Sequence, residues 1–149
     1  MKLAPLILAT GAAAILAGTA TATAASTPSC SLASTKRVKA ALGITVGSAT
    51  VTRNGPVTVC LFMSTPALLV RFETKETPAL YSYGRKGFSQ HHEPTKTVTG
   101  LGTSAYSASL AGGKSNTIIV LKGTVELLIT GAEPLHKLEA LAKLILPSL

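Results

Sequence analysis

TIIVLKGTVELLIT, residues 117–130, is the stretch that decides the fold class. Two strongly apolar runs flank Lys122-Gly123, a two-residue loop whose glycine tolerates the positive φ that hairpin turns require. Both runs carry apolar residues at successive positions, so we expect both faces of these strands to be covered, at least in part. The stretch therefore predicts a hairpin in the middle of a β-sheet.

Further strand patterns lie on both sides of this hairpin. Residues 46–63 alternate around RNGP, which predicts a second hairpin whose later strand begins after Pro56, because proline cannot donate to a ladder. ALLVRFETK, residues 67–75, has the composition of another strand, and SAYSASL, residues 104–110, follows a turn. These patterns predict an antiparallel sheet of about five to six strands.

The first segment with helical periodicity is SLASTKRVKAALG, residues 31–43. Ser34 is the expected N-cap and Gly43 the expected end of the helix. Val38, Ala41 and Leu42 share one apolar face between them.

The second such segment is EPLHKLEALAKLILPSL, residues 133–149. Pro134 suits the first turn of a helix. One apolar stripe then contains Leu135, Leu138, Leu141, Ala142 and Ile145. An N-terminal and a C-terminal helix packed on an antiparallel sheet make an α+β domain.

Residues 79–93, ALYSYGRKGFSQHHE, leave the local structure open. A helix here would carry Leu80, Tyr83 and Phe88 inward. Gly84 and Gly87 oppose it, because each costs about 1 kcal/mol in a helix interior.

The N-terminus has the three parts of a secretory signal peptide: Lys2, an uncharged run from residue 3 to 16, and the small residues AGTATATAAS. A transmembrane anchor is the alternative, but the apolar run is shorter than the roughly 20 residues that span a bilayer. Thr19 stands where a lipoprotein signal has its cysteine, so we expect no lipid and no stable membrane anchor. We predict a cleaved signal at residues 1–24 and a single domain at residues 25–149, secreted to the extracellular or cell-envelope space.

Cys30 and Cys60 are the only two cysteines. In an oxidising, exported setting an even pair indicates a disulfide. Two cysteines so far apart make a poor metal site, since structural zinc normally has four ligands.

The charge of the chain is strongly basic. Removing Lys2 from the 14 Lys and Arg leaves 13 against 6 Glu, a net +7 for the mature chain, and there is no Asp. A basic surface favours anionic partners, although colloidal solubility explains it equally well. The cations are scattered and lack the aromatic-basic pattern of a base-stacking surface, so we expect no nucleic-acid partner.

Arg85, Lys86, His91 and His92 form the candidate binding loop, within RKGFSQHHEPTK. The adjacent histidines could ligate a metal together with Glu93 or His136, but their spacing matches no usual zinc motif, so no metal site is predicted. A pH-responsive surface patch is the other interpretation, because two imidazoles would charge near about pH 6–7.

Motifs for catalysis are absent from the sequence. No serine occupies a G-x-S-x-G elbow, and the six glutamates form no candidate pair. We therefore expect a non-catalytic protein without a cofactor that binds an envelope protein, lipid or glycan. The alternative is a secreted enzyme inhibitor or small hydrolase, an analogy that rests on fold class alone.

CSLASTKRVKAALG, a second cysteine in CLF, VTGLGTSAY, VLKG and LEALAKLILPSL follow one another along the mature chain. In this order they resemble the actinobacterial exported proteins and lipoproteins of the type called domain of unknown function 3558. The chain departs from that pattern at Ser34, Arg37 and Thr103, and in lacking the lipobox cysteine. The resemblance implies the fold and an envelope location, and it implies no catalytic residue.

Overall fold

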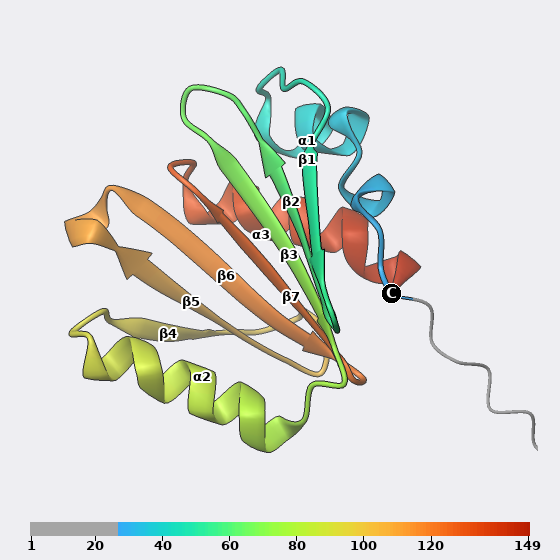
Figure 1. Cartoon of the computed structure of the whole chain (residues 1–149). Helices are drawn as coiled ribbons and strands as arrows, with labels where there is room; N and C mark the ends of the chain where they lie inside the picture. The colour runs from blue at the N-terminus through green and yellow to red at the C-terminus, as the bar shows by residue number, and fades with distance from the viewer. Residues whose placement is uncertain (1–26) are drawn as a thin grey trace, which may run out of the picture.

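The structure is a computed structural model that describes residues 27–149, so the predicted signal peptide at residues 1–24 lies outside the described residues. Figure 1 shows one antiparallel sheet with strand order β1-β2-β3-β7-β6-β5-β4. The strands are β1 Thr50–Asn54, β2 Val57–Phe62, β3 Leu68–Thr74, β4 Thr95–Val98, β5 Ser104–Leu110, β6 Ser115–Lys122 and β7 Val125–Gly131. The predicted α+β class is confirmed, but the sheet has seven strands instead of five to six.

The hairpin predicted from residues 117–130 is β6 and β7, and it lies in the middle of the sheet as expected. Its loop, however, is Gly123-Thr124, because Lys122 still pairs with Val125 across the ladder. Gly123 has φ +60°, a conformation that glycine adopts without steric cost.

The strand that the sequence did not predict is β4, which pairs with β5 at one edge of the sheet. Its four residues, TKTV, give no apolar alternation to detect. The first hairpin also differs at its start: β1 begins at Thr50, whereas Val46 is buried in the connection from α1. The later strand begins at Val57, directly after Pro56, as predicted.

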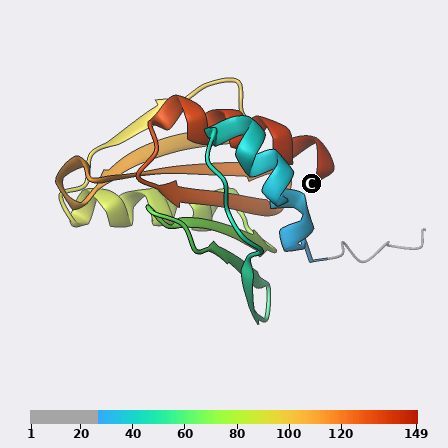
Figure 2. The ribbon, with the colours of Figure 1, turned by 90° about the horizontal axis from the view of Figure 1, so that it is seen from above.

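Both predicted helices pack on the same face of the sheet, where Figure 2 shows α1 (Thr35–Leu42) beside α3 (Leu135–Ile145). Ser34 caps α1 by accepting from the Arg37 N–H, and Gly43 ends it in the left-handed conformation. The Lys137 ammonium of α3 donates to the Leu42 carbonyl at 2.8 Å, which joins the two helix ends. Three short 3-10 helices complete the elements: η1 Cys30–Ala33, η2 Ala111–Gly113 and η3 Leu146–Ser148.

The main core lies between this helix pair and the sheet. The apolar stripe of α3 is buried there as predicted, with Leu135 at its half-buried margin. Against it pack fully buried side chains of the central strands: Val70, Phe72, Ile118, Val120, Leu127 and Ile129.

The disulfide predicted between Cys30 and Cys60 is confirmed. It joins η1 to β2, with the two Cα atoms 5.6 Å apart. Cys60 is fully buried, so the bond ties the entry of the first helix into the main core.

The opposite face of the sheet is covered in part by a third helix, α2 (Pro78–Gln90). Thr77 caps α2 by accepting from the Leu80 N–H at 3.2 Å. The predicted inward face is wrong in part, because Leu80 is 55% and Tyr83 75% exposed. Phe88 is half-buried against the ring of Tyr106 on β5, as predicted. Tyr81, which was not predicted to point inward, packs against the same ring.

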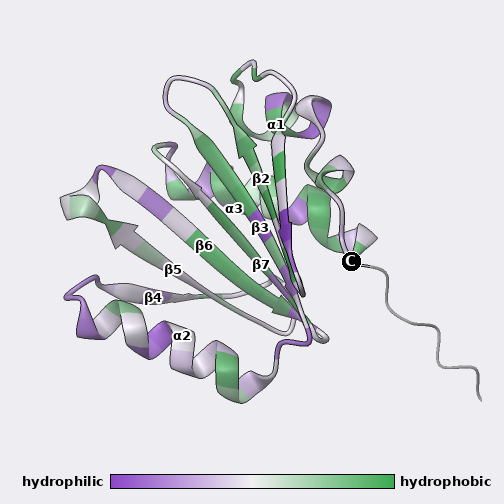
Figure 3. Cartoon of the chain, viewed as in Figure 1, coloured by the Kyte–Doolittle hydropathy of each residue, from purple (hydrophilic) through white to green (hydrophobic). Residues whose placement is uncertain are grey.

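In Figure 3 the central strands are rich in hydrophobic residues, whereas α2 carries several hydrophilic ones. Of the helices in the described part of the chain, none has the length and apolarity that crossing a membrane requires.

Candidate functional site

The four residues of the predicted binding loop do not form one loop. Arg85 and Lys86 lie within helix α2, and only His91 and His92 belong to the turn that follows it. The two pairs open into different hollows. The prediction of a single loop is therefore wrong, because the helix continues through both of its glycines to Gln90.

His91 and His92 are exposed and lie with Glu93 beside the turn at residues 111–113. His136 cannot join them, because it lies in the first turn of α3, which packs on the face of the sheet opposite to α2 (Figure 2). Among residues 27–149, no group of three or more His, Cys, Asp or Glu could hold a metal ion.

A groove of about 760 Å³ lies between α2 and the β4–β5 edge of the sheet. Its volume lies within the range of about 300–1,000 Å³ typical of small-molecule sites. Ser82, Arg85, Lys86 and Ser89 line the helix side. The sheet side is formed by the end of β4, the start of β5 and the loop of residues 99–103 that joins these two strands.

Arg85 is the best-anchored side chain in this groove. Its Nε donates to Thr95 Oγ1 at 3.3 Å, and one terminal nitrogen donates to Thr97 Oγ1 at 3.1 Å. The guanidinium carbon lies 5.3 Å from the centre of the Tyr106 ring, a cation–π distance. Three contacts from two strands therefore hold the guanidinium in place.

No carboxylate lies within salt-bridge distance of Arg85 among the described residues, where the ion pairs involve Arg71 and Lys137. The lining of the groove likewise includes no Asp or Glu in that part of the chain. Arg85 and the exposed Lys86 thus give the groove a positive potential that no neighbouring acid in its wall neutralises.

The loop of residues 99–103 is fixed against β6. The Thr103 N–H donates to the Leu121 carbonyl at 2.7 Å, and Leu101 is buried in the main core. Gly102 has φ +55°, and a Cβ there would lie 2.4 Å from the Leu121 oxygen, so only glycine fits. These contacts hold the backbone of this wall of the groove against β6.

The floor of the groove includes Tyr81, whose hydroxyl donates to the Ile119 carbonyl at 3.3 Å. Burial raises the pKa of Tyr81 to about 12, and the charge of Glu126 adds to the effect. Burial also raises the pKa of Tyr106. Both phenols therefore stay neutral at physiological pH.

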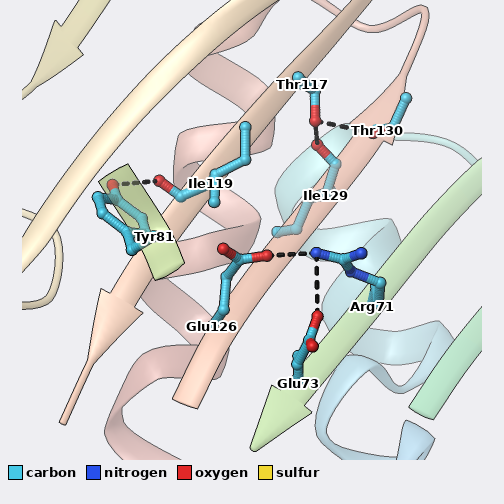
Figure 4. Close-up of polar contacts among 8 residues, drawn as sticks. All are labelled: Arg71, Glu73, Tyr81, Thr117, Ile119, Glu126, Ile129 and Thr130. Carbon is cyan, nitrogen blue, oxygen red and sulfur yellow. Dashed lines mark hydrogen bonds and ion pairs between the residues drawn. The ribbon is translucent and has the colours of Figure 1, made fainter. Parts of the chain in front are cut away.

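Within residues 27–149, no helix covers the rest of this face, over β7, β3 and β2 (Figure 1). Figure 4 shows Arg71 of β3 between Glu126 of β7 and Glu73, which lies 3.4 Å away. The Glu126 side chain is only 7% exposed. Burial raises its pKa, although the Arg71 guanidinium works in the opposite direction.

Sequence reasoning found Arg85 and Lys86 but missed the hydroxyl groups around them. Ser82 and Ser89 are separated by seven positions on α2, so they lie on one side of the helix. This spacing could have indicated that the two hydroxyl groups face the same site. Thr95 and Thr97 were missed because β4 itself was missed.

Comparisons of the chain with protein-family models, with curated proteins and with solved structures found no match. The resemblance to the domain-of-unknown-function family therefore stays a prediction.

Proposed function

We propose that this protein is an exported, non-catalytic binding module of the cell envelope, and that its ligand lies in the groove beside α2. The observation that carries the proposal is the groove itself, which combines a site-sized volume with two cations and a row of hydroxyl groups. In the described part of the chain, the lining of the groove includes no imidazole, thiol or carboxylate that could act as the general base for one of these hydroxyl groups.

Export is supported by the disulfide, because such bonds persist in oxidising compartments. The signal-like N-terminus supports the same location. Of the three partner classes expected from the sequence, the groove suits a glycan or another small polar ligand better than a protein or a lipid. Its lining includes six Ser and Thr residues and two cations, which can form hydrogen bonds and ion pairs with a polar ligand.

The structure gives no support to the hypothesis that this protein is an enzyme inhibitor. It required residues 85–96 to protrude as a loop, and most of this segment is the packed end of α2 or the paired strand β4. No observation singles out a hydrolase either.

A ligand-retention experiment tests the proposal. The exported protein is incubated with the small-molecule and glycan fraction of an envelope extract, re-isolated, and analysed by mass spectrometry. Ser89→Trp is the comparison variant, because Ser89 is exposed on α2 and a bulky ring there would fill the groove.

We expect the wild type to retain a compound that S89W loses, with both proteins unfolding at the same urea concentration. Equal retention by the two proteins would place the ligand elsewhere. Turnover of the retained compound would show an enzyme instead of a binding module.

A further inference from the structure

Arg85 and Lys86 form no ion pair within residues 27–149, which indicates that the ligand of the groove carries a negative charge. Resting on the proposed function above, we propose that the groove recognises an anionic saccharide, with the acidic group of the sugar bound by Arg85 and Lys86 and the sugar hydroxyls bound by the Ser and Thr side chains of the wall.

The first argument is the state of Arg85. Two of its nitrogens are occupied by Thr95 and Thr97, and its remaining N–H groups have no carboxylate partner within the described chain. A fixed guanidinium with free donors matches the geometry of a carboxylate or phosphate. Because its position is already fixed, little rotamer entropy is lost when an anion binds.

The second argument is the neighbouring charge. Lys86 follows Arg85 in α2, lines the same groove and is exposed. It lies in no ion pair of the described residues. Two cations in one groove, without an acid in its lining, favour an anionic group over a neutral one.

The third argument concerns the rest of the ligand. The volume of about 760 Å³ exceeds what a small inorganic anion fills. Hydroxyl side chains donate and accept hydrogen bonds, so they complement the hydroxyl groups of a sugar. The wall offers Ser82, Ser89, Thr99, Thr103 and Ser104, together with apolar carbons of Pro78 for the C–H surface of a sugar ring.

The test is isothermal titration calorimetry with four probes that separate the acid from the sugar: glucose 6-phosphate, glucuronate, glucose and inorganic phosphate. The phosphate and carboxylate arms distinguish the two sources of negative charge. We expect at least one of the two acidic sugars to bind more tightly than both glucose and inorganic phosphate, with an affinity that falls as salt is raised.

Three variants locate the acidic group. Arg85→Gln should weaken binding by about 10- to 100-fold, the range for loss of a charge-assisted hydrogen bond. Lys86→Glu is the second variant, because this exposed side chain can be changed without disturbing the fold. It should weaken binding by at least about 10-fold, since it places a negative charge beside the bound acid. Lys96→Gln is the matched control: Lys96 lies between Thr95 and Thr97 on β4, so its side chain points to the other face of the sheet.

Binding that R85Q and K86E leave unchanged, or that K96Q weakens equally, would overturn the proposal. Preferential binding of glucose would also overturn it, while leaving the groove as a ligand site. If none of the four probes binds, the anionic-saccharide assignment fails, and the retention experiment with S89W still decides whether the groove binds anything.

Discussion

On the face covered by α1 and α3, strands β3 and β7 contribute Val70, Phe72, Leu127 and Ile129, all fully buried. On the opposite face the alternating residues of the same two strands include Arg71, Glu73 and Glu126. The first face gains stability from apolar area removed from water. The second holds a carboxylate that is buried beside an arginine, and burial of an ion pair contributes little net stability.

The helices differ in the same way as the two faces. The α3 helix buries Leu138, Leu141, Ala142 and Ile145 completely. In contrast, α2 buries chiefly Tyr81, exposes Tyr83 and contains two glycines. The comparison shows that one face of the sheet supports the fold, while the other tolerates polar and charged groups, which we propose to serve binding.

The largest loss of stability is expected when the disulfide, which lies on the first face, is removed. Cys60→Ser should lower the free energy of unfolding by about 4 kcal/mol, because the unfolded chain regains loop entropy and Cys60 is fully buried. Urea denaturation measures it. Cys30→Ser together with Cys60→Ser should cost about as much as Cys60→Ser alone, and a clearly additive loss would contradict a shared bond.

The next effect compares one apolar residue from each helix. Leu141→Ala should cost about 3 kcal/mol, because it opens a cavity in the main core. Phe88→Ala on α2 should cost only about 1–2 kcal/mol, because Phe88 is half-buried. Thermal and urea unfolding of both variants check the order, and a larger loss for F88A would reverse our assignment of the two faces.

A substitution at Glu126 is expected to raise the free energy of unfolding, by less than the previous substitutions lower it. Because burial raises its pKa in the folded protein, the folded state binds a proton there more strongly than the unfolded state does. The wild type therefore loses stability as pH rises through the folded-state pKa. Glu126→Gln, which mimics the neutral carboxyl, should be more stable than the wild type at pH 7, and the gap should close as the solution is acidified.

Urea unfolding of the wild type and E126Q across this pH range provides the measurement. Thr130→Val on the same strand carries no titrating group and should show a pH-independent difference from the wild type. A gap for E126Q that widens on acidification would contradict a raised pKa for Glu126 in the folded protein.

The smallest effect is spectroscopic. Since the pKa of Tyr81 is about 12, its phenol should not ionise in the range where free tyrosine titrates. Tyr81→Phe should therefore leave the ultraviolet absorbance change between about pH 9 and pH 11 the same as in the wild type. A smaller change in Y81F would mean that Tyr81 is accessible to water and that α2 covers it less tightly than the structure shows.

Much of the first face could be predicted from the sequence, because α3 and the β6–β7 hairpin bury regular apolar patterns. The second face could not be predicted in this way, because α2 and β4 lack a regular pattern of apolar residues. The strand β4 has only four residues, mostly polar, so it shows no alternation of apolar and polar positions that could be recognised in the sequence. The helix α2 is oriented by the contact of Tyr81 with Tyr106, which lies 25 positions later in the chain. The groove lies between these two elements. Its two cations could be picked out from the sequence, but the Ser and Thr residues of its wall could not.

A map of amide chemical shifts is the most direct test of the proposal that one face of the sheet supports the fold and the other binds a ligand. Nitrogen-15 spectra of the protein are recorded while glucose 6-phosphate and, in a separate titration, glucuronate are added. We predict that shifts are confined to α2, β4 and residues 99–105, and that the amides of α1 and α3 stay unchanged. Shifts centred on α1 or α3, or no saturable shift in the groove, would contradict the account.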